Sequence, residues 1–296
     1  MKRYLNLGCG NRFHPDWTNV DMVSSSPHVV AHNLCEGIPY PDAHFEVVYH
    51  SHVLEHFSRK EGREFLRECV RVLKPGGIIR VAVPDLEHIV RLYLNSLEQA
   101  LDEDIQAQHN YEWMLLELYD QTVRNHSGGE MAAYLQRETI PNESFVMDRL
   151  GEEGREIRRR ALMAKENRVK APEDGLNPNR VPLGRRVNAL LRPLKERVLR
   201  LLLGNDWNLM NELRMGSGPN TLALKIGKFR LGGEIHQWMY DRYSLTQLLQ
   251  DLGIRHVEVK SALESSIPGW NAFELESKNE IVFKPDSLFV EGRKAE

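Results

Sequence analysis

The chain has 296 residues, of which 41% are hydrophobic and 27% are charged, and its net charge is -3 at pH 7. This length favours one core with an insertion over two full domains. A near-neutral chain of ordinary composition predicts no global attraction to nucleic acid, so any basic surface is local. Cys9, Cys35 and Cys69 lack Cys-x-x-Cys spacing, which argues against a disulfide framework and a structural zinc site.

The start of the chain leads directly into a strand-like segment rather than into an apolar leader. No later apolar run approaches the length that spans a bilayer. With the unpaired cysteines, these features predict a cytoplasmic protein that is neither secreted nor integral to a membrane.

Residues 1–100 alternate short apolar runs with turn signals, which is typical of an α/β sheet with parallel strands. A helix is expected from about Arg59 to Leu73, where apolar residues recur at helical spacing, and the following Lys-Pro-Gly-Gly sequence ends it. The predicted strands are Tyr4–Leu7, Thr18–Met22, Val29–Ala31, Phe45–Tyr49 and Ile78–Val83.

The pattern then changes to helices, with long ones predicted over residues 86–119 and a basic, strand-poor segment over residues 151–204. A helix at Ser244–Leu252, with a Ser244/Gln247 capping box, precedes strands at Arg255–Val259 and Leu288–Val290. We therefore predict an α/β, Rossmann-like domain made of residues 1–101 and 236–296. A helical insertion or lid over residues 102–235 interrupts it before the last strands.

The strongest motif is the strand-turn sequence Leu5-Asn6-Leu7-Gly8-Cys9-Gly10-Asn11, followed by an acid, Asp21, at the end of the next strand. Glycines at this turn let a ligand approach the backbone closely, and the acid can accept hydrogen bonds from ribose hydroxyls. A dinucleotide site would need a third glycine where Phe13 stands and an acid about 20 residues after the glycines. These features predict an adenosine-type ligand without a pyrophosphate, for which S-adenosylmethionine is the matching cofactor.

Residues 4–85 resemble the cofactor domain of class I S-adenosylmethionine-dependent methyltransferases, particularly small bacterial ones related to the ubiquinone-pathway group. The resemblance rests on Leu7-Gly8-Cys9-Gly10, Asp21, the stretches Ile38–Asp42 and Phe45–Val48, Leu54-Glu55-His56 and Arg71–Gly77. It implies that Asn33 and Leu34 flank the adenine and that Tyr49 and His50 lie beside the methionine part. The expected cofactor-binding residues are Asn6, Gly8, Cys9, Gly10, Asn11, Asp21, Met22, Asn33, Leu34, Tyr49 and His50.

Two features depart from the pattern of this family. Asn33 stands where many relatives carry Asp, although its amide can still bond the adenine edge. The stretch Asn11–Trp17 is too short for the usual first crossover helix, because parallel strands normally need about a dozen connecting residues. We therefore expect a single turn or an irregular loop there.

Methyl transfer to oxygen or nitrogen needs donor and acceptor held in line, and a histidine can accept the proton of a hydroxyl. Ligands of open α/β sheets bind at the carboxyl ends of the strands. Residues expected at that edge or on the substrate side are therefore candidates for catalysis. They are His50 and His52 after the fourth strand, Asp85 after the fifth, and His236 before the last helix.

The sequence His52-Val53-Leu54-Glu55-His56 also has a spacing found in metal proteases. In the small-RNA end-methylating enzymes and some ubiquinone-pathway relatives, a Glu-His pair at this place binds a divalent metal, which keeps a metal reading open. The motif lacks identifiable third and fourth ligands, so we expect no metal and assign Glu55 and His56 to ordering the start of the helix.

Residues 185–204 combine leucines and valines at helical spacing with Arg and Lys. The segment is expected either to pack over the active site or in a homodimer, or to contact an anionic membrane peripherally. Few aromatics accompany its charge, which disfavours nucleic acid as a partner.

The sequence thus predicts a methyltransferase that acts on an oxygen or nitrogen of a small polar, glycan or lipid-linked acceptor. The Trp238–Asp241 and Lys284–Gly292 segments loosely resemble those of methyltransferases that act with glycan enzymes. A non-catalytic cofactor-binding scaffold and a nicotinamide-dependent oxidoreductase are the alternatives.

Overall fold

The computed structural model describes residues 3–170 and 219–296 of the chain. It has two compact units, residues 1–160 with 233–296, and residues 161–232. The first unit carries the sheet and every site discussed below. Of the second, the described part comprises the end of helix α5 (Glu143–Lys170) and helix α8 (Pro219–Arg230). Most of the basic segment 151–204, including residues 185–204, lies outside the described residues.

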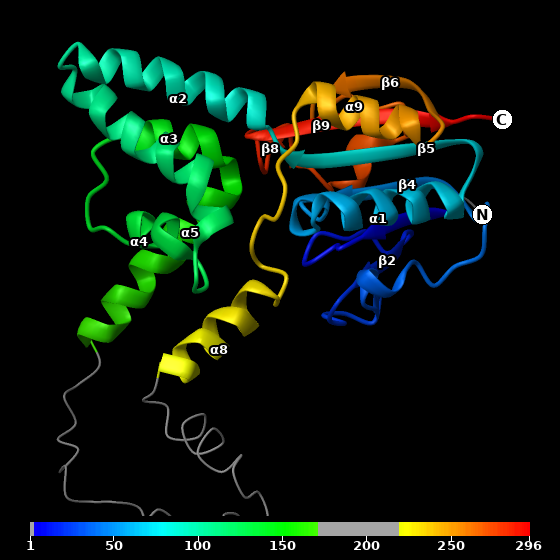
Figure 1. Ribbon diagram of the computed structural model, residues 1–296, viewed down its shortest axis with the longest axis horizontal. Coiled ribbons are helices and arrows are strands. Elements are labelled where there is room, and N and C mark those ends of the chain that lie inside the picture. The colour runs from blue at the N-terminus through cyan, green and yellow to red at the C-terminus, as the bar shows by residue number, and fades with distance from the viewer. Residues whose placement is uncertain (1–2, 171–218) are drawn as a thin grey trace, which may run out of the picture. The chain divides into compact units, whose positions relative to one another are not determined.

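One seven-stranded sheet organises the first unit, in the order β3-β2-β1-β4-β5-β9-β6 (Figure 1). The strands β1 to β5 run parallel, whereas β9 is antiparallel to both β5 and β6. The predicted α/β sheet is confirmed. The strands are β1 (Tyr4–Leu7), β2 (Thr18–Asp21), β3 (Val29–Ala31), β4 (Phe45–Ser51), β5 (Leu73–Pro84), β6 (Ile254–Lys260) and β9 (Ser287–Lys294). A separate ribbon pairs β7 (Ser277–Lys278) with β8 (Ile281–Val282).

Each face of the sheet carries a hydrophobic cluster, because successive side chains of a strand point to opposite faces. In β5, Ile79, Val81 and Val83 belong to the main core, whereas Ile78 packs on the other face. The cluster on this second face combines aromatic and aliphatic side chains. It contains Tyr4, Trp17, Val47, Tyr49, Ile78, Ile267, Trp270 and Leu275.

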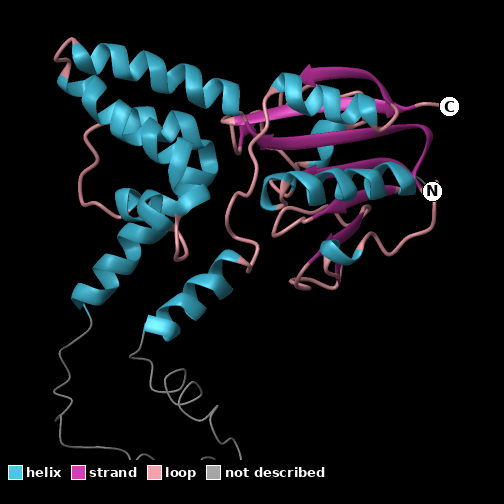
Figure 2. Ribbon diagram, in the orientation of Figure 1, coloured by secondary structure: helices cyan, strands magenta, loops and turns pink. Residues whose placement is uncertain are grey.

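Helices α1 (Arg59–Val72) and α9 (Arg242–Asp251) cover the first face (Figure 2). Helix α1 begins with a capping box in which the Ser58 hydroxyl and the Glu61 carboxylate bond each other's backbone amides. The expected helix and its end are confirmed to within one residue.

The start of α9 differs from the prediction. The capping box is formed by Asp241 and Ser244, not by Ser244 and Gln247. The Asp241 carboxylate accepts from the Ser244 amide at 2.7 Å, and the Ser244 hydroxyl accepts from the Asp241 amide at 3.1 Å. Two overlapping capping patterns occur in the sequence, and the helix begins at the earlier one because a carboxylate is a strong acceptor at a helix N-terminus.

The connection from β1 to β2 contains no helix, as the short Asn11–Trp17 stretch predicts. Buried asparagines hold this loop instead. The Asn6 amide donates to the Arg12 carbonyl at 3.0 Å and to Asn19 Oδ1 at 3.2 Å. The Asn19 amide in turn donates to the carbonyls of His14 and Trp17, both at 3.0 Å. These bonds satisfy the loop backbone that a crossover helix would otherwise satisfy internally.

The insertion between β5 and β6 is mainly helical in its described part, as predicted. Helices α2 (Leu86–Leu101) and α3 (Ile105–Val123) lie on the side of the sheet where β5 ends (Figure 1). With α4 (Gly129–Leu135) and the first part of α5 they enclose a separate core around Trp113 and Tyr134. Among the described helices, none combines the length and apolar character that crossing a membrane requires.

A buried charge cluster fixes the centre of the second face. Arg80, in β5, is fully buried and forms ion pairs with Glu276 and, at 2.6 Å, with Glu291. Its remaining donors reach the carbonyls of Ser261 and Glu264, both at 2.9 Å. The cluster joins β5, β9 and the 261–276 loop.

We expect Arg80→Met to destabilise the protein by about 3 to 5 kcal/mol, because two buried carboxylates lose their partner. Chemical denaturation at pH 7 measures this loss. The variant Arg63→Met removes a cation from an exposed ion pair with Asp251 and serves as control. A stability loss below that of the control would contradict the role given to the cluster.

Candidate functional site

A cavity of about 690 Å³ opens beside the glycine turn that follows β1. Its wall on the sheet side comes from the ends of β1 and β4, the start of β9 and residues 275–284, and its other wall comes from α5. The residues that line it are Asn6, Gly8, Cys9, Gly10, Asn11, Arg12, Tyr49, Ser51, His52, Glu152, Glu153, Glu156, Ile157, Arg160, Leu275, Glu276, Phe283, Lys284, Ser287 and Phe289. Six of the predicted cofactor residues are thus brought together: Asn6, Gly8, Cys9, Gly10, Asn11 and Tyr49.

The glycine turn has a backbone that other residues tolerate poorly. Gly8 and Gly10 have φ values of 62° and 53°, in the left-handed region. A Cβ at Gly8 would lie 2.3 Å from Val53 Cγ2, whereas a Cβ at Gly10 would meet no protein atom within 4 Å. Gly8 therefore serves close packing, and Gly10 leaves bare backbone beside the cavity.

The carboxylate predicted to bind ribose lies next to this turn. Asp21 Oδ2 accepts from the Gly10 amide at 2.7 Å, and Oδ1 from the Val23 amide at 3.4 Å. Asp21 is half-buried, and Met22 beside it is exposed. Neither residue lines the cavity as described, and both lie at the carboxyl end of β2 beside its glycine rim.

Asn33 and Leu34 lie after β3 and do not line the cavity. Asn33 Oδ1 accepts a hydrogen bond from the Cys35 backbone amide at 3.1 Å, so the Asn33 side chain caps the short helical turn Leu34–Glu36. Its side-chain amide donates to Glu36 at 3.0 Å. Their predicted place beside an adenine remains a prediction.

Cys9 lines the cavity but is poorly suited to nucleophilic chemistry. Burial, assisted by the nearby charge of Asp21, raises the pKa of the Cys9 thiol to about 12. Because the thiolate is the reactive form, Cys9 stays an inert thiol at neutral pH.

His52 is the candidate histidine that reaches the cavity. Its Nε2 lies 2.8 Å from the Ser287 hydroxyl, and its Nδ1 lies 3.1 Å from Glu55 Oε1. The backbone of His52 is left-handed, with φ of 53°, a conformation that non-glycine residues seldom adopt outside constrained sites. The histidine is thus held between a hydroxyl at the cavity wall and a buried carboxylate.

Glu55 is completely buried in the 3-10 turn Leu54–His56 (η2). Burial would raise the pKa of its carboxyl, but the contact with His52 and the charges that His52, His236 and His56 carry when protonated outweigh this effect and lower the pKa to about 2. Glu55 is therefore a carboxylate at neutral pH. Its backbone carbonyl accepts from the Gln237 and Trp238 amides at 2.7 and 3.2 Å, which brings the segment before α9 against this turn.

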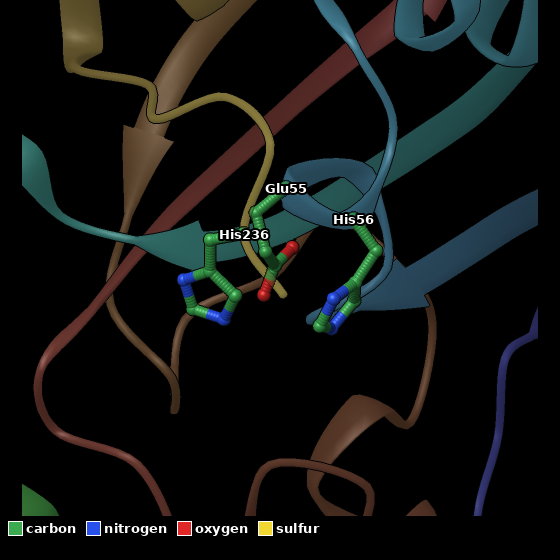
Figure 3. Close-up of side chains that lie close together, drawn as sticks. All are labelled: Glu55, His56 and His236. Atoms are coloured by element: carbon green, nitrogen blue, oxygen red, sulfur yellow. The ribbon is translucent and has the colours of Figure 1, made fainter. Parts of the chain in front are cut away.

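Three side chains converge at this point and could together hold a metal ion. They are Glu55, His56 and His236, and one ligand atom from each lies within 4.8 Å of the others. Figure 3 shows the Glu55 carboxylate between the two imidazoles. His236 is buried, and this burial lowers the pKa of its imidazole to about 3, so it stays neutral. His236 does not line the cavity.

Two further predicted catalytic residues lie away from the cavity. His50 is fully buried on the opposite face of β4, with its ring 5.0 Å from that of Phe65. Alternation along β4 explains this placement, since Tyr49 and Ser51 face the cavity. Asp85 accepts from the His88 amide at 3.1 Å and is the N-cap of α2. Helix capping accounts for its position after β5.

Several cavity residues were not found from the sequence. Ser287 lies at the carboxyl edge of the parallel strands because β9 runs antiparallel and pairs Ser287 with Pro84. An antiparallel β9 in the sequence prediction would have placed Ser287 at this edge. On the α5 side, Glu153 forms ion pairs with Arg12 at 3.0 Å and Lys284 at 3.3 Å. No local pattern predicts that contact.

Comparison with known proteins gives a consistent result for the first part of the chain. Residues 5–81 match the family model of a methyltransferase domain. A protein of Mycolicibacterium smegmatis, named as a probable S-adenosylmethionine-dependent methyltransferase, is 43% identical over 53 residues. That match covers 18% of this chain and 20% of the other protein, so the chain spans about a fifth of the relative's length.

Solved structures that resemble this chain include the following three proteins. A SAM-dependent methyltransferase from Archaeoglobus fulgidus is 12% identical, with a TM-score of 0.36, over 99% of this chain and 86% of that one. The YcgJ protein of Bacillus subtilis is 22% identical, with a TM-score of 0.24, over 31% and 52% of the two chains. A phosphoethanolamine N-methyltransferase of Haemonchus contortus, complexed with phosphoethanolamine and S-adenosylhomocysteine, is 15% identical, with a TM-score of 0.25, over 30% and 23%.

Residues 5–81 therefore carry a methyltransferase domain, and the class I methyltransferase resemblance derived from the sequence is confirmed for this part of the chain.

His50 gives a direct test of the core that supports this site. Burial lowers the pKa of His50 to about 4, although the charge of Glu55 acts in the opposite direction. Below pH 6.5 the unfolded chain binds a proton at His50 that the folded chain does not bind until about pH 4. This histidine therefore lowers the free energy of unfolding as the pH falls from 6.5, by about 2 kcal/mol at pH 5.

We expect His50→Leu to remove this contribution to the pH dependence of the free energy of unfolding between pH 7.5 and 5, as measured by urea denaturation. His126→Leu, at an exposed position, should retain it. An unchanged slope in His50→Leu would show that His50 is not the buried neutral base described here.

Proposed function

We propose that this chain is an S-adenosylmethionine-dependent methyltransferase that binds its cofactor in the cavity beside Gly8–Asn11. The observation that carries the proposal is the bare backbone of Gly10 at the cavity rim, hydrogen-bonded to the Asp21 carboxylate at 2.7 Å. A volume of about 690 Å³ lies within the range of small-molecule sites, about 300 to 1,000 Å³.

The residues present suit this cofactor chemically. Asp21 is positioned to accept from ribose hydroxyls with the oxygen lone pairs that its backbone bonds leave free. Glu152 gives the far wall an anionic group that suits a cationic ligand, whereas Glu153 and Glu156 on the same wall form ion pairs with basic side chains. The Arg12 guanidinium lies 3.8 Å from the Phe283 ring centre, and its ion pair with Glu153 closes the cavity beside the turn. S-adenosylmethionine supplies an electrophilic methyl group on a sulfonium.

The polar acceptor is proposed to react through an oxygen or nitrogen, with His52 as its general base. His52 faces the cavity, and the buried carboxylate of Glu55 orients its Nδ1 and stabilises the imidazolium that forms. Ser287 holds Nε2 at 2.8 Å until an acceptor hydroxyl takes its place. The cavity walls carry acidic and basic side chains, which suit a small polar or glycan-type acceptor better than an apolar one.

Two other functions use the same cavity. A non-catalytic cofactor-binding scaffold would keep the glycine turn and bind the cofactor without transferring its methyl group. A nicotinamide-dependent oxidoreductase is disfavoured, because Phe13 stands where the third glycine of a dinucleotide turn would be. Homodimerisation and peripheral membrane contact through residues 185–204 are also proposals, and they concern residues outside the described part of the chain.

The first test is cofactor binding to Gly10→Ala. The added methyl group meets no protein atom, so we expect S-adenosylmethionine affinity to fall about tenfold or more because the ligand must approach this backbone. Isothermal titration calorimetry measures the change.

Gly253→Ala is the matched control, since Gly253 also has a left-handed φ, 87°, and open space around its Cβ but lies after α9, outside the cavity lining. Both substitutions carry a similar backbone strain of about 1 kcal/mol. Equal affinities in the two variants would place the cofactor elsewhere.

The second test is transfer itself. Wild-type protein is incubated with methyl-labelled S-adenosylmethionine and with glycan, lipid, RNA and small-hydroxyl pools. Label in a glycan or small-molecule pool supports the proposed acceptor class. Cofactor binding without label in any pool supports the scaffold.

Once the acceptor pool has been identified, it can serve as the substrate in rate measurements. We expect His52→Gln to lower the rate of methyl transfer about 100-fold or more while cofactor affinity stays unchanged, because only the proton acceptor is lost. His126→Gln, at an exposed position, serves as control. Equal turnover in wild type and His52→Gln would remove His52 from the mechanism.

A further inference from the structure

We infer that Glu55, His56 and His236 form a binding site for one divalent transition-metal ion of the zinc type. The three residues come from the turn after β4 and from the segment before α9, 180 residues apart in the sequence, yet one donor atom from each lies within 4.8 Å of the others. Figure 3 shows the three side chains directed toward a common space. This inference does not rest on the proposed function, since metal binding is measurable without cofactor or acceptor.

The first observation behind the site is an unsatisfied buried carboxylate. Glu55 is completely buried, and neither of its carboxylate oxygens has a hydrogen-bond partner of good geometry among the described residues. His52 Nδ1 lies 3.1 Å from Oε1 at ion-pair distance, which leaves Oε2 unpaired. A buried polar oxygen without a partner is costly, and coordination to a cation would satisfy it.

Arg124, whose charge acts on His236, does not supply that missing charge. Arg124 lies 3.1 Å from Glu234 and 3.9 Å from Asp120, so its guanidinium is paired with other carboxylates. A cation drawn from solution is therefore the partner that fits Glu55.

The second observation is that the His56 imidazole is already oriented. His56 Nδ1 lies 3.1 Å from the Ile235 carbonyl, which leaves Nε2 as the ligand atom. Bonding of the second ring nitrogen to a carbonyl is the usual way in which proteins fix a metal-binding histidine. The rings of His56 and His236 lie 5.0 Å apart at 78°, so they approach one point from different directions.

The backbone holds these ligands together. The His236 amide donates to the Gln121 carbonyl at 2.9 Å, and the amides of Gln237 and Trp238 both donate to the Glu55 carbonyl. The donors already lie within 4.8 Å of one another, so only small side-chain rotations would be needed to reach the spacing of about 3.4 Å that tetrahedral zinc bonds of about 2.1 Å require.

The donor set defines the class of ion and of site. Two histidines and one carboxylate are borderline ligands that suit zinc and other first-row divalent ions and do not suit magnesium or calcium. Three protein ligands leave a fourth position open, as in catalytic rather than structural zinc sites. Because Glu55 also contacts His52, a bound ion would fix the carboxylate that orients the cavity histidine.

The test uses the full chain after dialysis against a chelator. Calorimetry with Zn²⁺ alone, and visible absorption with Co²⁺ alone, should each give one ion per chain, with a tetrahedral or five-coordinate cobalt spectrum. Glu55→Gln, His56→Ala and His236→Ala should each weaken Zn²⁺ binding about 100-fold or more. The control His126→Ala, at an exposed position, should bind as wild type does.

His236→Cys separates ligand loss from misfolding. Cysteine can ligate in place of histidine, so this variant should recover Zn²⁺ binding and shift the cobalt spectrum toward thiolate absorption. Circular dichroism of the metal-free variants shows whether they are folded. If His236→Ala is unfolded, Zn²⁺ binding by His56→Ala and His236→Cys tests the site in its place. Absence of Zn²⁺ binding to wild type, or equal binding by wild type and the folded variants, would overturn the site.

Discussion

The site depends on a left-handed turn of backbone that favours glycine. After β1 the chain must bend so that β2 can return beside it, and positions 8 and 10 do this in the left-handed region. At Gly8 a side chain would collide with Val53, and at Gly10 the missing side chain leaves backbone open to the cavity. The two glycines, with Cys9 between them, thus serve different purposes: Gly8 allows close packing, and Gly10 leaves backbone accessible to a ligand.

Parallel strands explain why the other functional groups gather at the same edge. The turns after β1 and β4 lie together because the strands run in one direction, and this brings His52 beside the glycine turn. The antiparallel strand β9 begins where the parallel strands end, which adds Ser287. The polar relay from Ser287 through His52 to Glu55 is therefore a consequence of sheet topology.

Much of this arrangement could be predicted from the sequence, because it is local. Continuous apolar runs predicted the strands, and the Gly-Cys-Gly turn followed by Asp21 predicted a cofactor edge at the place where a cavity opens beside Gly8 and Gly10. The positions of His50 and His52 could not be separated, because side-chain direction depends on where β4 ends. The structure extends β4 to Ser51, so His50 points into the core.

Tertiary contacts decided what local patterns could not. The motif around Glu55 and His56 lacked a third ligand in the sequence because His236 lies far along the chain, in a segment held by backbone bonds to Glu55. The α5 wall of the cavity likewise depends on an ion pair between Arg12 and Glu153. Spacing alone identifies neither contact, since long-range pairing follows from how the helical insertion folds against the sheet.

The most direct test of the proposed cofactor site is a crystal structure of the protein with S-adenosylhomocysteine. We expect density for the ligand against the backbone of residues 8–11, with its ribose hydroxyls on the Asp21 carboxylate and its amino-acid end in the cavity near Tyr49. Ligand density away from the glycine turn, or a ribose without contact to Asp21, would contradict it.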